Sequence, residues 1–378
     1  MSTKPILPGA TLGILGGGQL GRMFTMAARS MGYQVIVLDP NSRSPAGQLA
    51  DVHLQAGYDD HGALRKMGEA CAAVTTEFEN VPAASLNELS RYCRVAPNAD
   101  AVAIVQDRSQ EKSWLRGHGF ATAPFVLIDS TEDLRTAANE VKFPAILKVS
   151  RFGYDAKGQI RLNDPGELRA AFEELKGVRC VLEARVSLDH EISVVLARND
   201  AGECVCFPTA ENHHRSGILD LTIVPARVSA ELADEAQALA RQVAEDLNYV
   251  GTLGVEFFVV DGKLLVNEIA PRPHNSGHYT LDACVTDQFE QQVKALCALP
   301  LGDARLLSPV VMVNLLGDIW KPVPDWLALL RHSGVKLHLY GKADARPGRK
   351  MGHYNCLAAS VEDATKLAQI TRGALGIV

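Results

Sequence analysis

The stretch VEFFVVDGKLLVNEIAPRPHNSGH, residues 255–278, decides the fold of this chain. Two apolar runs flank Asp261 and Gly262, a strong signal for two antiparallel strands joined by a tight turn. The segment after the second run holds two prolines and a glycine, which exclude a helix there. The sequence therefore predicts a β-hairpin that leads into a rigid, polar loop.

The length of the hairpin loop decides which side chains face each other. A two-residue loop would place Glu256 opposite Asn267, whereas a three-residue loop over 261–263 places it opposite Glu268. We prefer the three-residue loop, because two carboxylates with Cβ atoms about 5 Å apart invite a cation between them. Hard oxygen ligands beside nucleotide phosphates suit Mg²⁺. The alternative is a polar strand face with the shorter loop.

The loop after the hairpin is rich in hydrogen-bond donors. It carries Arg272, His274, Asn275, Ser276 and His278. Because no helix forms here, the two histidines are not the i, i+4 pair of a zinc helix. A rigid donor-rich loop beside a metal and phosphate site suits a small oxyanion such as a carboxylate or bicarbonate.

A lysine and a glycine-bearing loop stand upstream, in AILKVSRFGYDAKGQ, residues 145–159. Lys148 ends an apolar strand, and the loop that follows can close its backbone amides over nucleotide phosphates while the lysine neutralises them. A Walker loop is absent. The alternative is a solvated hairpin with an extended lysine.

Two further segments carry polar side chains. VLEARVSLDHEISV, residues 181–194, is predicted as a strand with Glu183 and Glu191, where a carboxylate could accept both ribose hydroxyls. ENHHRSGI, residues 211–218, is predicted as a loop that brings His213 and His214 together. Solvated glutamates and a polar turn are the alternatives.

The N-terminal region alternates short apolar runs with helix-like stretches from residue 11 to about residue 100, which predicts a parallel βαβ sheet. GILGGGQLGRM, residues 13–23, fits G-x-G-x-x-G, and Asp39 follows a second apolar run. This spacing suits a dinucleotide, but the same strand, turn and helix serve a mononucleotide or tight packing alone.

A cationic loop near the C-terminus, YGKADARPGRKMGH, residues 340–353, is a candidate phosphate clamp. Ordinary surface charge is the alternative. The chain as a whole has a net charge of −6 and a pI of about 6.0, so nothing in its composition indicates binding to nucleic acid or anionic lipid.

With 378 residues, the chain is long enough for two or three domains. No apolar run approaches the length of a membrane span and the N-terminus lacks a secretory pattern, so we expect a cytoplasmic protein without membrane partners. The eight cysteines are scattered, with only Cys204 and Cys206 close together, and we expect reduced, mainly structural thiols.

Taken together, these motifs resemble the ATP-grasp superfamily and, within it, the family of 5-(carboxyamino)imidazole ribonucleotide synthetases. The segments GGGQLGRM, TEFENVP, QDRSQEK, FGYDAKGQ, ENHHRSGI, NEIAPRPHNSGH and RPGRKMGH occur in that family's order. The resemblance implies a mixed α/β and α+β protein with a Rossmann-like N-terminal domain over 1–105, an ATP-grasp domain over 106–305 and a small C-terminal domain over 306–378. It also implies a homodimer.

The resemblance further implies the reaction. Bicarbonate and MgATP would form carboxyphosphate, which carboxylates the amine of 5-aminoimidazole ribonucleotide in purine biosynthesis, leaving ADP and phosphate. The first glycine loop would then serve this mononucleotide, and Asp39 would have no ribose to bind. The family flap usually reads GYDGKGQ, whereas Ala156 replaces a glycine here, so a positive φ at that position would cost stability.

Site residues follow from the same resemblance by position. ATP would contact Arg108, Lys148, Gly153, Tyr154, Asp155, Lys157, Gly158, Gln159, Glu183, Ala184, Arg185, Val186, Glu191, His214, Asn267 and Glu268. Mg²⁺ would be held by Glu256 and Glu268. The catalytic residues would be Tyr154, Asp155, Arg272, His274, Asn275 and Lys350. The ribonucleotide would contact Gln19, Leu20, Glu77, Lys342, Arg349 and Lys350.

Three other interpretations stay open at this stage. A formate-dependent phosphoribosylglycinamide transformylase or a biotin carboxylase-like enzyme would share the ATP-grasp fold. An NAD-dependent dehydrogenase would use the first glycine loop but leave the paired glutamates and the basic loop unexplained. A catalytically inactive nucleotide-binding protein would lack the carboxylate pair.

Overall fold

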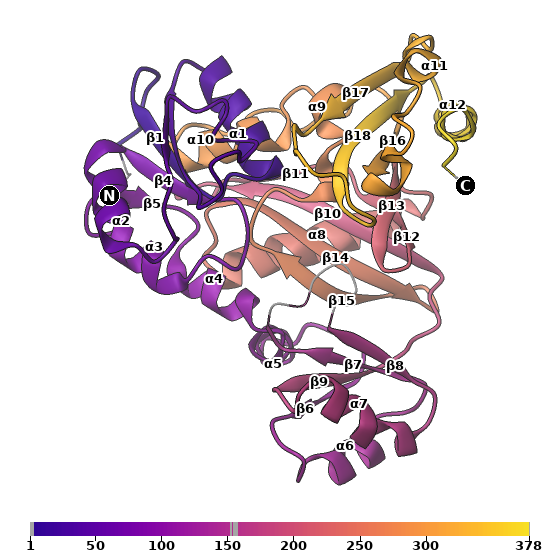
Figure 1. Cartoon of the computed structure of the whole chain (residues 1–378). Coiled ribbons are helices and arrows are strands. Elements are labelled where there is room, and N and C mark those ends of the chain that lie inside the picture. The colour runs from indigo at the N-terminus through magenta and orange to yellow at the C-terminus, as the bar shows by residue number, and fades with distance from the viewer. Residues whose placement is uncertain (1–3, 152, 154–157, 378) are drawn as a thin grey trace.

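The computed structural model describes residues 4–151, 153 and 158–377, and it is a mixed α/β structure built on three sheets (Figure 1). The N-terminal sheet, a small four-stranded sheet and a long central sheet follow one another along the chain. In Figure 1 the small sheet lies at the end of the molecule opposite the N-terminal sheet and the C-terminal strands. The mixed α/β prediction is confirmed.

The N-terminal sheet is entirely parallel, as the alternation of apolar runs and helix-like stretches predicts. Its strand order is β3-β2-β1-β4-β5. The strands are β1 (Thr11–Leu15), β2 (Gln34–Leu38), β3 (Val52–Leu54), β4 (Ala73–Thr76) and β5 (Arg94–Val95). The helices are α1 (Gln19–Ser30), α2 (His61–Ala70), α3 (Ala83–Leu89) and α4 (Ala99–Gln106).

The four-stranded sheet is antiparallel with the order β6-β9-β7-β8. Its elements are α5 (Arg108–Gly117), β6 (Phe125–Ile128), α6 (Leu134–Glu140), β7 (Ala145–Val149), β8 (Gln159–Leu162), η1 (Pro165–Glu167), α7 (Leu168–Glu174) and β9 (Cys180–Ala184). Its core packs Leu147 and Leu182 of the sheet with Phe172 of α7. Asp107 separates α4 from α5 and caps α5 by accepting from the amides of Ser109 and Gln110.

The central sheet has nine strands among the described residues and runs β15-β14-β10-β12-β13-β16-β18-β17, with β11 beside β10. The strands are β10 (His190–Arg198), β11 (Cys204–Cys206), β12 (Ala210–Arg215), β13 (Ile218–Val224), β14 (Gly251–Val260), β15 (Lys263–Ala270), β16 (Val310–Leu316), β17 (Val335–Leu339) and β18 (Lys350–Leu357). Because β13 pairs with β16, the C-terminal strands extend the same sheet rather than forming one of their own.

Helices and short turns complete the central region. They are α8 (Ala230–Asp246), η2 (Asn275–Gly277), α9 (Thr280–Ala283), α10 (Gln288–Leu296), η3 (Gly317–Trp320), α11 (Trp326–Leu330) and α12 (Val361–Ala374). Helix α8 packs through Ala240 and Val243 against Leu253 and Val255 of β14. Helix α10 reaches the N-terminal domain, where Phe289 and Val293 join the core of β1 and α1.

Two segments differ from their sequence-based predictions. The predicted single strand over 181–194 is two strands, β9 and β10, which belong to different sheets, so Glu183 and Glu191 are carried by separate halves of the structure. The predicted loop at 211–218 is mostly strand β12, whose turn uses Ser216 and Gly217 with positive φ. A local apolar pattern does not show where the chain leaves one sheet for another, which explains both errors.

The hairpin of β14 and β15 also corrects a prediction. Its turn has two residues, Asp261 and Gly262, both with positive φ, as the tight hairpin turn requires. The predicted three-residue loop is therefore wrong. Glu256 nevertheless lies opposite Glu268, because a β-bulge between Glu256 and Phe257 adds one residue, Asn267, to β15. The expected pairing is right for a different reason.

All eight cysteines lie in the described part of the chain and are free thiols, five of them buried. This agrees with the predicted absence of a disulfide framework. Among the described residues, no helix combines the length and the apolar character needed to cross a bilayer.

Replacing Gly262 with Ala tests the hairpin turn. Nothing lies within 4 Å of a Cβ added at Gly262, so its φ of +70° alone should lower the free energy of unfolding, by about 1 kcal/mol. Gly373→Ala is the matched control, because that added Cβ also meets nothing within 4 Å but sits in helix α12. The control should stabilise by about 0.5–1 kcal/mol. Thermal unfolding checks both, and a loss of stability in both variants would contradict the assignment.

Candidate active site

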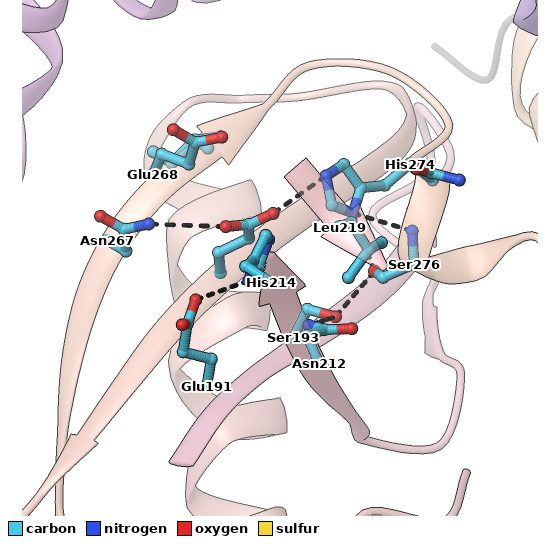
Figure 2. Close-up of polar contacts among 12 residues, drawn as sticks. Glu191, Ser193, Asn212, His214, Leu219, Asn267, Glu268, His274 and Ser276 are labelled. Carbon is cyan, nitrogen blue, oxygen red and sulfur yellow. Dashed lines mark hydrogen bonds and ion pairs between the residues drawn. The ribbon is translucent and has the colours of Figure 1, made fainter. Parts of the chain in front are cut away.

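The candidate site is built around the two carboxylates that the hairpin bulge brings together. Glu256 of β14 and Glu268 of β15 are paired in register. The bulge residue Asn267 lies beside Glu268 (Figure 2). The Asn267 amide donates to Glu256 Oε2 at 3.4 Å, while its Oδ1 is buried with no hydrogen-bond partner among the described residues. Two carboxylates and a free amide oxygen form a cluster of hard oxygen donors.

His274 holds the second oxygen of Glu256. Its Nε2 lies 3.1 Å from Glu256 Oε1, and its Nδ1 lies 2.8 Å from the Ser276 hydroxyl oxygen, so both ring nitrogens are engaged. Burial raises the pKa of Glu256, but the hydrogen bond and charge of His274, together with His214, outweigh it and bring the pKa to about 2. The carboxylate therefore stays ionised at neutral pH.

A buried chain of hydrogen-bonded hydroxyl and amide groups leads to the His274 imidazole. Ser193 of β10 lies 2.7 Å from Ser276, Asn212 of β12 donates to Ser193 at 2.8 Å, and Thr222 of β13 donates to Asn212 at 3.0 Å. These bonds run through three adjacent strands and end on the imidazole. These bonds could not be predicted from the sequence, since single serine and asparagine residues on strands carry no signal.

The loop that carries His274 and Asn275 is fixed by two reciprocal amide pairs. The Gln288 side chain accepts from the His274 amide at 2.8 Å and donates to its carbonyl at 2.9 Å. Asn275 and Asn314 of β16 exchange bonds of 3.0 and 2.8 Å. Gly254 lets this loop approach, because a Cβ there would come within 2.7 Å of the His274 Cβ. The predicted rigidity of the loop has these contacts as its cause.

The place of Lys148 at a strand end suggested an isolated lysine. In the structure, Lys148 and a second lysine contact the same buried carboxylate. Lys148 Nζ lies 2.7 Å from Glu183 Oε1, and Lys112 Nζ of α5 lies 2.8 Å from Glu183 Oε2. Burial raises the pKa of Glu183, but the two lysines outweigh it and hold the pKa at about 2. Burial lowers the pKa of Lys148, with Glu183 opposing. Lys112 was not among the predicted site residues, although the quoted segment QDRSQEK contains it.

Helix α5 joins the lysine cluster to the carboxylate pair. Arg108 at its first turn lies 3.6 Å from Glu268, and Glu111 accepts from the Ile269 amide at 2.6 Å. Burial raises the pKa of Glu111 to about 7, partly opposed by Arg108. Glu111, which lies one turn after Arg108 on the same helix, was not among the predicted site residues either.

The other nucleotide-side residues fall in two groups. Glu191 and His214, from adjacent strands, form an ion pair of 2.7 Å (Figure 2), and this pairing raises the pKa of His214 although burial opposes it. Strand β9 ends at Ala184, and Arg185 and Val186 follow it outside the sheet, where the Arg185 amide donates to the Pro144 carbonyl at 2.9 Å.

Only part of the predicted flap can be placed. Gly153, Gly158 and Gln159 are described, with Gln159 opposite Lys148 and Gly158 at a φ of +70°. A Cβ at Gly158 would lie 2.6 Å from Val149. Tyr154, Asp155, Ala156 and Lys157 lie outside the described residues.

The glycine loop after β1 does not present an open anion site, because the chain's own carboxylate fills it. Glu77 accepts from the Gly21 amide at 3.0 Å, and a Cβ at Gly18 would lie 2.0 Å from its other carboxylate oxygen. Burial raises the pKa of Glu77 to about 7, with Gly21 and Gly18 opposing. Asp39 is likewise engaged, by the Gly17 amide and Tyr58. The dehydrogenase interpretation loses its phosphate site.

The cationic C-terminal loop meets the same region of the N-terminal domain. Lys342 Nζ donates to Gln19 at 2.6 Å and to the Lys350 carbonyl at 2.7 Å. A polar cavity of about 70 Å³ lies here, lined by Asn41, Arg43, Pro45, Lys342, Ala343, Asp344 and Arg349. Arg43 was not among the predicted site residues. Leu20 is buried in the core beside this surface.

Arg272 links the loop that carries His274 and Asn275 to the N-terminal domain. Its Nε donates to Glu79 at 2.6 Å, and Glu79 lies two residues after Glu77. The candidate residues thus form two clusters. One holds the carboxylate pair with Lys148, Arg108 and His274, and the other holds Gln19, Glu77 and Lys342. Arg272 connects the two through Glu79. Glu79 was missed, although it stands in the quoted motif TEFENVP.

Comparison with known proteins gives three family models that match successive parts of the chain. They are a ribonucleotide synthetase preATP-grasp domain over 9–106, an ATP-grasp domain over 113–289, and a phosphoribosylaminoimidazole carboxylase C-terminal domain over 310–367. The N5-carboxyaminoimidazole ribonucleotide synthase of Bacillus subtilis (strain 168) is 46% identical over 354 residues, covering 93% of each chain. That of Brucella melitensis biotype 1 is 45% identical over 356 residues, covering 93% of this chain and 98% of its own.

Solved structures agree. The ADP complex of an N5-carboxyaminoimidazole ribonucleotide synthetase superposes with a TM-score of 0.94 at 43% identity, covering 99% of this chain and 98% of that one. The Aspergillus clavatus enzyme in complex with ADP and 5-aminoimidazole ribonucleotide has a TM-score of 0.89 at 30% identity, covering 98% and 99%.

The Glu183 cluster makes a pH-dependent prediction. Glu183→Gln leaves Lys148 and Lys112 buried without a counter-charge and should cost about 3–5 kcal/mol near neutral pH. Because the pKa of Glu183 falls from 4.5 to about 2 on folding, its stabilisation is complete above pH 4.5 and disappears as the pH falls toward 2.

Thermal unfolding without nucleotide measures this effect. The difference in Tm between the variant and the unchanged chain should be constant from pH 7 to 5 and shrink below pH 4.5. Glu173→Gln, an exposed change on α7 of the same sheet, should leave Tm unaltered at every pH. A Glu183→Gln difference that persists undiminished at pH 3 would refute the cluster.

Proposed function

The chain belongs to the N5-carboxyaminoimidazole ribonucleotide synthases, a family of ATP-grasp ligases, and we propose how its side chains divide the reaction. It catalyses the ATP-dependent carboxylation of 5-aminoimidazole ribonucleotide in purine biosynthesis and forms a carbon–nitrogen bond. The co-substrate is bicarbonate, and the reaction passes through carboxyphosphate. The opposed carboxylates of Glu256 and Glu268 are the observation that carries this assignment.

Mg²⁺ fits the donor set at the bulge. Glu256 and Glu268 are carboxylates, and the orphaned Oδ1 of Asn267 is a third hard oxygen. Among the described residues no group of three His, Cys, Asp or Glu side chains is placed to hold a metal, and Mg²⁺ commonly takes only one or two carboxylates when phosphates and water complete its shell. When bound, it would neutralise charge on the transferring phosphoryl group.

The nucleotide lies between the four-stranded sheet and the nine-stranded central sheet. Lys148 and Arg108 are the cations for its phosphates, and Glu191 is the acceptor for ribose hydroxyls. Backbone groups of 183–186 read the adenine edge. The lysine pair at Glu183 supports this role, because the buried carboxylate holds the Lys148 ammonium in place before nucleotide arrives.

Bicarbonate is a poor electrophile, and phosphorylation by ATP makes it a mixed anhydride that can carboxylate an amine. Arg272, His274 and Asn275 position bicarbonate and then carboxyphosphate. The reciprocal bonds of Gln288 and Asn314 support this role by preventing the loop from moving. A preorganised donor set stabilises developing charge without reorganising during the reaction.

The ribonucleotide lies between the N-terminal glycine loop and the cationic loop. Gln19, Leu20 and Glu77 contact it from one side, and Lys342, Arg349 and Lys350 take its phosphate from the other. The cavity beside Lys342 and Arg349 adds Arg43 to the phosphate clamp. Tyr154, Asp155 and Lys350 handle the proton of the acceptor amine. Domain bounds of 1–105, 106–305 and 306–378, a homodimer and a cytoplasmic location complete the proposal.

The first test measures ADP formation by the purified protein with MgATP and bicarbonate, with and without 5-aminoimidazole ribonucleotide. The ribonucleotide should raise the rate at least about 10-fold, because the preorganised site needs its acceptor to complete the transfer. Bicarbonate-free buffer is the control. Turnover with formate and phosphoribosylglycinamide instead would favour a transformylase, and no stimulation by the ribonucleotide would contradict the acceptor.

Glu268→Gln tests the carboxylate pair. The change keeps the size of the side chain but removes one charge, and should lower kcat for Mg²⁺-dependent ADP formation by at least about 100-fold. Tm should change little, because Glu268 is partly exposed. Glu235→Gln, an exposed change on α8, is the matched control and should keep full activity. Near-normal turnover in Glu268→Gln would eliminate the pair as a metal site.

A further inference from the structure

The segment that follows β4 reaches into the site at two points. Glu77 accepts from the Gly21 amide at 3.0 Å on the ribonucleotide side. Two residues later, Glu79 accepts from Arg272 Nε at 2.6 Å on the bicarbonate side. One short segment of the N-terminal domain therefore contacts both the proposed ribonucleotide site and the proposed bicarbonate site.

The Arg272 bond is of the kind that orients an arginine. Nε lies in the plane of the guanidinium, so a bond at Nε fixes that plane and the direction of the two terminal nitrogens. The Nη1 group donates to the Pro273 carbonyl at 3.2 Å. Among the described residues the Nη2 group of Arg272 has no hydrogen-bond partner, so it can donate to an oxyanion.

The pair remains charged. Burial raises the pKa of Glu79, but the charge and hydrogen bond of Arg272 outweigh it, so the pKa lies below its usual range. Burial lowers the pKa of Arg272, and Glu79 more than reverses this. Both side chains are about a quarter exposed or less. An ionised, partly shielded pair of this length restrains the arginine without excluding a further anion.

We propose that Glu79 is a positioning residue for this reaction, which sets the Arg272 guanidinium in the orientation that binds bicarbonate. The inference rests on the proposed function. It assigns to a residue of the N-terminal domain, and not only to the ATP-grasp loop, a part in binding the co-substrate. Glu79 itself touches neither bicarbonate nor nucleotide; it acts through Arg272.

The test compares Glu79→Ala and Glu79→Gln in bicarbonate-depleted buffer with added bicarbonate. Glu79→Ala frees the guanidinium and should raise KM for bicarbonate by about 10- to 100-fold, with KM for ATP changed less than twofold. Glu79→Gln keeps an oxygen that accepts from Nε and should restore KM for bicarbonate to within about threefold of the unchanged chain. A purely structural role would not give this rescue with an unchanged KM for ATP.

Asp200→Ala is the matched control. Asp200 forms an ion pair of 3.0 Å with Arg94 that also joins the N-terminal domain to the central region, and its exposure is close to that of the Glu79 pair. This variant should leave all KM values unchanged. In an Arg272→Ala background, Glu79→Ala should add less than about a twofold effect, because its action runs through the arginine.

Three results would overturn the inference. One is an unchanged KM for bicarbonate in Glu79→Ala, the second is an equal loss of affinity for bicarbonate, ATP and ribonucleotide, and the third is a full additional effect in the Arg272→Ala background. Failure of the proposed function is a different result: the unchanged chain would then show no bicarbonate-dependent ADP formation at all.

Discussion

The repulsion between Glu256 and Glu268 is the constraint on which the rest of the site depends. Two carboxylates in register on adjacent strands destabilise a sheet unless positive charge or donors compensate them. Here His274 contacts Glu256 and Arg108 contacts Glu268. The carboxylate pair of the hairpin is therefore stabilised by groups from the following loop and from α5. The protein keeps this unfavourable pair, which is expected where a cation binds during function.

The surrounding structure is organised to keep these compensating groups still. His274 ends a chain of buried hydrogen bonds that crosses three strands, and Gln288 fixes its backbone from α10. Lys148 is held by Glu183 in the same manner. In each case a charged or donor group that we assign to ligand binding is held by a buried partner, so its orientation is set before ligands arrive.

The glycine loop after β1 shows how a familiar motif can change its use. Its glycines allow close approach of an anion to the first turn of α1, as in dinucleotide-binding proteins. The anion here is the Glu77 carboxylate of the same chain, which leaves no space for a pyrophosphate. The motif alone could not distinguish these uses, because the difference comes from a residue more than fifty positions away.

Much of the architecture and most candidate residues could be predicted from the sequence, because strand periodicity, turn residues and ordered motifs are local. The parallel N-terminal sheet, the hairpin at Asp261 and the flanking polar loop are of this kind. The bulge that pairs Glu256 with Glu268, the change of sheet between Glu183 and Glu191, and the contacts of Lys112 and Glu79 could not. They arise where segments distant in sequence meet, and only tertiary packing decides which donor faces which charge.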